Sequence, residues 1–240
     1  MCSSDLGQVG LHIGQAVDRQ ALPVGKLHDR AALTAERGAR IGRIARHGDR
    51  DRLRADMYAL LGELLRKEPS DEVIGTVAGF QGDGSEIGSA SSVLATLAGK
   101  LSGDEIRDEY MRLFIGVGRG EILPFASYYL TGFLNDKPLA NLRNDMTELG
   151  IERAEGVKDP EDHIASLFDI MGGMIHGAFG APTDLAAQAR FFKKHIEPWA
   201  PLLMQDIEAA KSAVFYAPVG TIGRAFMDIE SAAFDMGEAG

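Results

Sequence analysis

The sequence predicts an all-α fold, a single globular bundle of roughly nine or ten helices. Three observations support this prediction. Apolar residues recur at helical spacing through most of the chain after residue 50. No segment shows the strict alternation that is typical of a half-buried strand. The chain has 240 residues, of which 45% are hydrophobic and 25% are charged, so it is long enough to bury one sizeable core.

The first predicted helices are marked by their ends. One apolar face runs from Leu53 to Leu65, and Pro69 stops that helix because proline breaks the backbone hydrogen-bond pattern. Ser70 is a suitable N-cap for a second, short helix. A glycine-rich loop then spans Gly79–Gly88, and another helix is expected over Ser91–Leu101.

A capping box of Ser102 and Glu105 opens the next helix, which has Tyr110, Leu113 and Phe114 on its apolar side. We expect these three residues to belong to the core. After an irregular segment, the remaining helices are predicted at Ser127–Leu134, Leu139–Leu149, Pro160–Phe179, Thr183 or Asp184 to His195, Pro198–Ile207 and Pro218–Ala233.

Residues 1–50 are predicted to form a poorly ordered, basic N-terminal extension that precedes a domain at 51–240. Glycines interrupt every apolar run, and arginines recur without a sustained apolar face. A nucleic-acid-binding arm or a targeting peptide would also be basic. However, five acidic residues dilute the eight basic ones, which favours a mistaken translation start or an added leader over both functions.

The formal net charge of −10 hides a strongly acidic domain. After residue 50 the chain carries seventeen basic and thirty acidic residues. Such a body repels nucleic acids and anionic membranes and favours a cationic partner. No apolar run is long enough to span a bilayer, and the single cysteine, Cys2, excludes an internal disulfide. We therefore expect a cytoplasmic protein without a nucleic-acid partner or stable membrane insertion.

No catalytic motif stands out in the sequence. The segment Gly116–Gly120 lacks the Gly-Lys-Ser/Thr ending of a phosphate-binding loop. A helical metal-dependent hydrolase that uses Asp162, His163, His176 and His195 remains an alternative, but no histidine pair has the i, i+4 spacing of a helical metal site. The sequence thus predicts neither catalytic residues nor a metal or cofactor of its own.

An acidic turn leads into the most apolar predicted helix. Asp159 is the expected N-cap and Pro160 is expected in the first turn, where its missing N–H does no harm. Asp162 and His163 would then lie in an exposed first turn. Two ionisable side chains are thereby placed at a hinge.

Five separated blocks occur in the order found in one family. They are Glu109–Phe114, Pro124–Tyr128, Asp159–Ile164, His195–Trp199 and Phe215–Tyr216. Together they resemble the redox-enzyme maturation chaperones of the TorD and DmsD type, which are related to the nitrate reductase assembly chaperones. The resemblance covers about residues 51 to 236 and depends on the order and spacing of the blocks.

The resemblance implies a cytoplasmic, non-catalytic chaperone for a molybdenum-cofactor oxidoreductase. Members of this family bind the signal peptide of the enzyme precursor, often a twin-arginine peptide, and delay export until the cofactor is inserted. The alternative is an assembly factor that binds the mature part of the molybdoenzyme. The identity of the client stays open, and so does the oligomeric state, either a monomer or a dimer that exchanges helices at Asn135–Pro138.

The resemblance also implies a site for the signal peptide. Asp162 would accept an arginine fork, and His163 would orient that arginine or tune its surroundings near neutral pH. Glu161, Ser127, Tyr128 and Glu109 complete the predicted signal-peptide site, and Asp159 and Pro160 form its hinge. Glu109 has the capping of a neighbouring helix as its alternative role.

The chain departs from the family pattern Pro-Tyr-Glu-Ser in the second block. It carries Phe125 and Ala126, so it lacks a hydroxyl and a carboxylate there. Any family role of those two groups is therefore in doubt for this chain.

Overall fold

The computed structural model describes residues 12–13, 47–116, 118–153, 159–180 and 182–238. The elements are β1 (His12–Ile13), α2 (His47–Arg66), α3 (Asp71–Ala78), α4 (Glu86–Lys100), α5 (Gly103–Tyr110), the π-helical turn η1 (Met111–Ile115), α6 (Ala126–Thr131), α7 (Lys137–Glu148), β2 (Ile151–Glu152), α8 (Ile164–His176), α9 (Leu185–His195), α10 (Ala200–Ala209) and α11 (Tyr216–Glu238). With ten α-helices among the described residues, the predicted all-α bundle is confirmed.

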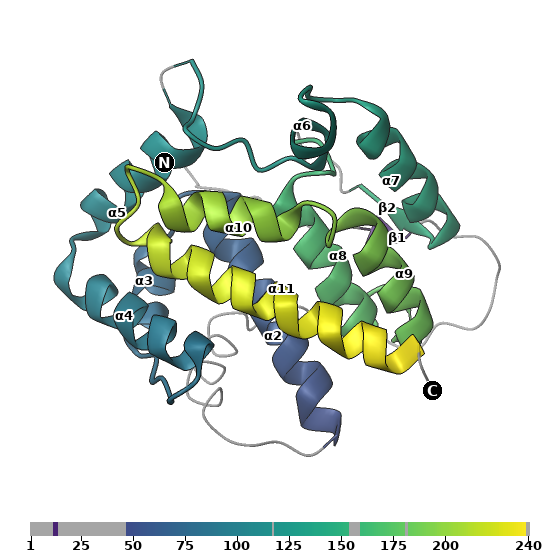
Figure 1. The fold of residues 1–240 in the computed structure, drawn as a ribbon, viewed down its shortest axis with the longest axis horizontal. Helices are drawn as coiled ribbons and strands as arrows, with labels where there is room; N and C mark the ends of the chain where they lie inside the picture. Colours follow the sequence, from purple (N-terminus) through teal and green to yellow (C-terminus); the bar gives the residue numbers. More distant parts are fainter. Residues whose placement is uncertain (1–11, 14–46, 117, 154–158, 181, 239–240) are drawn as a thin grey trace, which may run out of the picture.

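Four helices form the centre of the bundle. Helices α10 and α11 pack against each other, and α2 packs along α8 (Figure 1). Helices α3, α4 and α5 lie at one end of the molecule, whereas α6, α7 and α9 lie at the other (Figure 1). This arrangement brings elements that are distant in sequence together at each end.

The core is rich in aromatic side chains. The fully buried aromatic residues are Tyr58, Phe168, Phe192, Trp199, Phe215 and Tyr216. Tyr110, Leu113 and Phe114 are buried as well, so their predicted place in the core is confirmed. Each ring removes a large apolar area from water, which makes this cluster a major source of stability.

Most of the predicted extension lies outside the described residues. Within it, His12–Ile13 pair with Ile151–Glu152 in a two-residue antiparallel ladder. Helix α2 already begins at His47, four residues before the predicted domain boundary. The boundary between extension and domain therefore stays a prediction.

Several helix ends confirm the predicted caps. The Ser70 side chain accepts a hydrogen bond from the Val73 N–H, and Ser102 with Glu105 forms the expected capping box. Asp184 rather than Thr183 caps α9. These local signals act within one turn of the chain, which is why the sequence reveals them.

Helices α4 and α6 differ from their predicted limits. Helix α4 starts at Glu86 instead of Ser91, because Ser85 caps it by accepting a hydrogen bond from the Gly88 N–H. Gly88 is required there, since a Cβ would lie 2.4 Å from the backbone nitrogen of Asp83. Helix α6 ends at Thr131 instead of Leu134, because Gly132 adopts a left-handed conformation.

A buried ionic network connects three helices. Arg54 on α2 donates to both carboxylate oxygens of Glu230 on α11, at 2.7 and 2.9 Å, and to Gln188 on α9 at 3.2 Å. The Tyr58 hydroxyl donates to the same Glu230 at 2.9 Å. Glu230 is only 1% exposed, so these partners compensate for the cost of burying its charge.

Glu109 holds the start of α11. Its two carboxylate oxygens accept hydrogen bonds from the backbone N–H groups of Val214, Phe215 and Tyr216, at 2.8, 3.0 and 2.8 Å. Because those N–H groups have a partner, α11 begins at Tyr216 rather than at the predicted Pro218. Glu109 thus takes the capping role, one of the two roles considered for it.

Replacing Glu109 by Ala should lower the free energy of unfolding by about 3 kcal/mol or more, because three backbone N–H groups lose their acceptor. Glu109→Gln should cost less, since it keeps one acceptor oxygen. Chemical denaturation measures both changes.

The matched control is Asp108→Asn, a neighbouring exposed carboxylate, which should change stability by less than about 0.5 kcal/mol. Wild-type stability in Glu109→Ala would show that the carboxylate does not hold α11.

Candidate functional site

Two of the sequence blocks meet at one end of the bundle. The Ala126 N–H donates to the carbonyl oxygen of Asp162 at 2.9 Å, and the Ile164 N–H donates to that of Pro124 at 2.9 Å. These two hydrogen bonds join the start of α6 to the start of α8. The second and third sequence blocks therefore form one structural unit.

Asp162 is buried at this junction. It is 1% exposed, so its expected place in an exposed first turn is wrong. Its Oδ2 accepts a hydrogen bond from the Ser127 N–H at 2.8 Å and thereby caps α6. Its Oδ1 is also buried and has no hydrogen-bond partner among the described residues. An unpaired buried carboxylate oxygen is costly, so its presence at this junction calls for an explanation.

His163 is the N-cap of α8, which starts at Ile164, four residues beyond the predicted start at Pro160. The helix starts late because residues 160–163 form a tight turn, in which the His163 N–H donates to the Pro160 carbonyl. The Nδ1 atom of His163 accepts a hydrogen bond from the Ala165 N–H at 3.1 Å. The ring also packs edge-on against Phe125, with the centroids 5.0 Å apart.

Burial, assisted by the charge of Arg66, lowers the pKa of His163 to about 3. The imidazole is therefore neutral at neutral pH, and Nδ1 keeps the lone pair that caps α8. We expected His163 to change its charge near neutral pH and so to tune the surroundings of a bound arginine. Because the ring is buried and its pKa is low, it does not take up a proton in that range. His163 supports the site as a neutral cap.

Glu161 is paired within the protein. Its Oε2 accepts hydrogen bonds from Arg143 Nε at 3.0 Å and from Arg143 Nη2 at 2.8 Å, and Arg153 lies 3.7 Å from Oε1. Burial alone would raise the pKa of Glu161, but the bonds with Arg143 hold it below its ordinary value. This ion pair ties the hinge turn to α7.

The two predicted residues on α6 differ in exposure. Ser127 is fully buried, and its hydroxyl accepts a hydrogen bond from the Asp136 N–H at 3.3 Å. Tyr128 is half-buried, and the guanidinium of Arg119 lies over its ring at 4.9 Å. Arg119 also donates to the Tyr128 hydroxyl. Of this pair, only Tyr128 can contact a partner without a structural change.

The structure brings five of the predicted site residues together and separates one. Asp162, His163, Glu161, Ser127 and Tyr128 lie at the junction of α6 and α8. Glu109 belongs instead to the cap of α11. Asp159 is exposed and Pro160 is half-buried in the turn before α8, and their role as a hinge stays a prediction.

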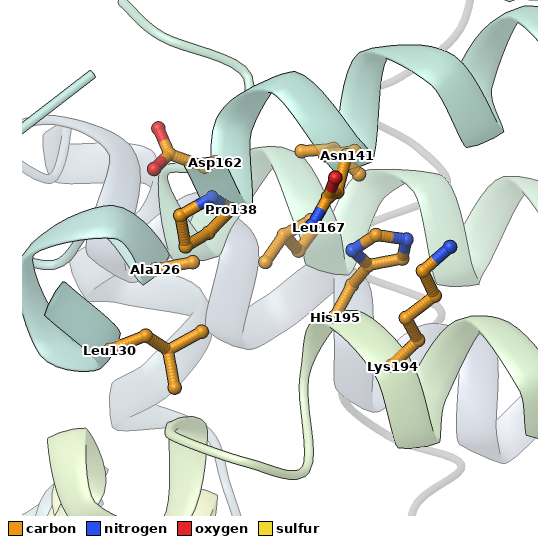
Figure 2. A pocket seen from close by; sticks show the side chains of 9 residues that line it. Ala126, Leu130, Pro138, Asn141, Asp162, Leu167, Lys194 and His195 are labelled. Carbon is orange, nitrogen blue, oxygen red and sulfur yellow. The ribbon is translucent and has the colours of Figure 1, made fainter. Parts of the chain in front are cut away.

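A pocket of about 100 Å³ opens beside this junction (Figure 2). Its walls come from α6, α7, α8 with the preceding turn, and α9. The lining residues are Ala126, Leu130, Pro138, Asn141, Leu142, Asp162, Leu167, Lys194 and His195. Figure 2 shows Asp162 on one side of the pocket and Lys194 and His195 on the other.

On the pocket wall opposite Asp162, the basic side chains are paired with an acidic residue of the protein. Asp145 on α7 lies 2.7 Å from Lys194 Nζ and 2.6 Å from His195 Nε2. Burial lowers the pKa of His195, although Asp145 acts in the opposite direction. For Asp145 itself, burial would raise the pKa, but Lys194 and His195 hold it below its ordinary value. The ammonium of Lys194 is thus balanced by Asp145, whereas Asp162 forms no ion pair with another described residue.

Sequence reasoning missed the pocket residues of α6, α7 and α9. Leu130, Asn141 and Lys194 carry no motif, and Asp145 meets His195 only through packing of helices that are distant in sequence. His195 was considered as a candidate metal ligand and as part of the fourth sequence block, but not as a pocket residue. Among the described residues, no three His, Cys, Asp or Glu side chains are placed to hold a metal ion.

Within the part of the chain that the structure describes, no helix has the length and apolar character needed to cross a membrane.

A family model described as the nitrate reductase delta subunit matches residues 81–205, just over half of the chain. The chain belongs to this family. The match includes helices α4 to α9 and therefore the whole junction and its pocket. The resemblance that the five sequence blocks indicated is thereby confirmed.

Curated relatives of this family member are named as chaperones. The chaperone protein TorD of Vibrio parahaemolyticus is 25% identical over 201 residues, which cover 75% of this chain and 93% of the relative. TorD of Photobacterium profundum is 31% identical over 142 residues, or 56% of this chain and 65% of the relative. These names confirm the prediction of a chaperone rather than an enzyme.

A crystal structure from Archaeoglobus fulgidus, provisionally described as a redox enzyme maturation protein, has a similar fold. The TM-score is 0.50 at 16% sequence identity, and the match covers 79% of this chain and 99% of the other. This likeness supports the all-helical architecture of the family member.

Stability should fall as the pH decreases from 7 to 5. His163 has a lower pKa in the folded protein than in the unfolded chain, so the unfolded chain binds more protons over this range. The contribution of His163 is present above about pH 6.5 and decreases by about 2 kcal/mol by pH 5. Denaturation curves at several pH values measure the slope.

His163→Asn keeps a side-chain acceptor for the α8 cap but cannot take up a proton in this range, so its slope should be shallower. The exposed His176→Asn serves as the control and should keep the wild-type slope. Equal slopes for wild type and His163→Asn would contradict the neutral, buried state of His163.

Proposed function

We propose that this chain is a chaperone that binds the precursor of a molybdenum-cofactor oxidoreductase by its N-terminal signal peptide and assists cofactor insertion before export. The observation that carries the proposal is the unpartnered, buried Oδ1 of Asp162 at the pocket. The relatives named as chaperones and the acidic character of the chain support it. The protein acts in the cytoplasm, where such precursors are made.

Asp162 is the group that receives a cationic side chain of the peptide. Its Oδ2 is held by the Ser127 N–H, and Oδ1 remains for a donor from the client. Because Oδ1 is buried, a guanidinium reaches it only when the junction rearranges locally, and it then replaces an unsatisfied buried acceptor with a charge-assisted hydrogen bond. The sequence predicted that an arginine would bond to both carboxylate oxygens of Asp162. With Oδ2 occupied by the Ser127 N–H, we propose instead a contact centred on Oδ1.

The neighbouring residues hold Asp162 in place rather than bind the peptide. Ser127 and His163 are buried in hydrogen bonds that order the starts of α6 and α8, and Glu161 is paired with Arg143. Tyr128 and Arg119 lie at the accessible side of the same junction and form its rim. Rigid support of this kind reduces the entropy lost when a peptide binds.

The size of the pocket limits what enters it. A volume of about 100 Å³ is equivalent to roughly three water molecules and suits one side-chain head group. We therefore expect a single arginine head group to enter it. In a twin-arginine signal peptide, one arginine would enter the pocket, and the other would remain at the surface.

The second candidate is an assembly factor that binds the mature part of the molybdoenzyme. The family description as a nitrate reductase subunit favours this candidate, because a subunit contacts the folded enzyme. It predicts that a precursor without its signal peptide still binds the chain. A pull-down with the client in both forms separates the two candidates.

Asp162→Asn should weaken the binding of an arginine-bearing signal peptide by roughly 1.5–3 kcal/mol, because the amide keeps the shape but not the charge. Calorimetric titration of the full chain with synthetic signal peptides measures the change.

Glu148→Gln, at an exposed position near the end of α7, makes the same change in net charge and should have little effect. Unchanged affinity in Asp162→Asn would remove Asp162 from the site.

The two arginines of a bound peptide should contribute unequally. Replacing the arginine that enters the pocket by glutamine should weaken binding at least about tenfold, whereas the same change at the surface arginine should cost threefold or less. Titration with the two singly substituted peptides measures both effects. Equal losses would show that the pocket does not select one arginine.

A further inference from the structure

Helix α6 covers Asp162 and forms one wall of the pocket. Ala126 and Leu130 line the pocket, and Figure 2 shows both on the same helix beside Asp162. The N–H groups of Ala126 and Ser127 donate to the carbonyl oxygen and to Oδ2 of Asp162. With α6 in this position, Oδ1 of Asp162 is buried.

Little apolar contact holds α6 in place. Of its six residues only Ala126 and Ser127 are buried, and both have small side chains. Leu130 is 44% exposed, and the two tyrosines are half-buried. Since buried apolar area is the main source of attachment between a helix and a core, moving α6 exposes little of it to water.

A hydrogen bond fastens α6 to α10. The Tyr129 hydroxyl donates to Asp206 Oδ2 at 2.7 Å, and the Tyr129 ring lies 5.4 Å from that of Trp199. Asp206 is exposed, so water replaces its partner at once when the bond breaks. Neither of these two polar groups touches Asp162, and the bond is therefore separable from the chemistry of the pocket.

The turn after α6 has backbone angles that suit a hinge. Gly132 has a φ of 81°, and Asn135 has a φ of 57°, the one positive φ of a non-glycine residue in the described ranges. Both residues are exposed. Dihedral angles can change in this turn without disturbing the core.

We propose that α6 is a lid. It swings away from Asp162 to admit the cationic side chain of the peptide and then closes over it, and the bond between Tyr129 and Asp206 sets how often it opens. This inference rests on the proposed function and adds the control of access to the same site. It accounts for the way in which a buried oxygen meets a donor from outside.

A lid of this kind controls rates rather than affinity. The free and the bound protein both have α6 closed, so each loses the same hydrogen bond on opening. Weakening that bond therefore raises the rates of binding and of release by the same factor. A residue that touches the peptide would instead change the affinity.

The test uses the full chain and a fluorescently labelled twin-arginine signal peptide in stopped-flow mixing. Tyr129→Phe removes the hydroxyl and keeps the ring against Trp199. It should raise the association and dissociation rate constants together by about two- to tenfold, with the dissociation constant within about twofold of wild type. Asp206→Ala should act in the same direction, and the double variant should not exceed the larger single effect.

Two controls match these variants. Tyr216→Phe removes a hydroxyl that donates to the Leu64 carbonyl at 3.1 Å, outside α6 and α10, and should keep the wild-type rates. Asp108→Ala removes one exposed charge, as Asp206→Ala does, and corrects for the electrostatic part of the association rate.

Hydrogen exchange tests the lid without the peptide. The amides of Ala126 and Ser127 should exchange about two- to tenfold faster in Tyr129→Phe than in wild type, because α6 opens more often. The amides of Leu203 and Ile207 on α10 should keep their rates. Equal exchange of the α6 amides in the two proteins would overturn the lid.

The peptide experiment separates the lid from the proposed function. Unchanged rates in Tyr129→Phe and Asp206→Ala, with weaker binding in Asp162→Asn, would overturn the lid and leave the proposed function standing. A change in the dissociation rate alone would show that Tyr129 contacts the peptide, which also overturns the lid. Failure of wild type to bind any signal peptide would overturn both.

Discussion

The functional end of this protein depends on the junction between α6 and α8. Backbone hydrogen bonds join the Pro124–Ser127 segment to the Asp162–Ile164 segment, and the carboxylate of Asp162 caps α6 from across this junction. Because α6 has only six residues, it has little stability of its own and needs this external cap. The position of α6 in turn sets the pocket wall at Leu130. Displacing Asp162 would therefore disturb the whole site proposed to bind the peptide.

Buried acidic residues have different roles in this structure. Glu109 holds the start of α11, Glu230 connects three helices through Arg54 and Tyr58, and Glu161 ties the hinge turn to α7. Each of these carboxylates has partners for both oxygens within the protein. Asp162 differs because one oxygen has none among the described residues. This contrast separates these three structural carboxylates from the one proposed to bind the peptide, and sequence position alone would not distinguish them.

The sequence predicted the local features of the fold well. Helix caps such as Ser70 and Ser102 act within one turn, and the apolar spacing reports which face of each helix is buried. Some errors occurred where a distant residue decided the local structure, and others where a local cap or turn was not recognised. Helix α11 starts two residues earlier than predicted because Glu109 reaches its first N–H groups. Helix α8 starts later because His163 takes the capping position after a tight turn.

By itself the sequence determined the all-α class, most of the helices, the acidic character and the family resemblance, since periodicity, composition and block order are all properties of the chain. Only the tertiary structure decided the state of the site residues. In the folded protein, Asp162, His163 and Ser127 are buried, and Glu109 caps α11. Helix packing also forms a pocket that has Asp162 on one side and Lys194 and His195 on the other. The physical reason is that burial and hydrogen-bond pairing depend on which helices pack together, and no local pattern in the sequence encodes those contacts.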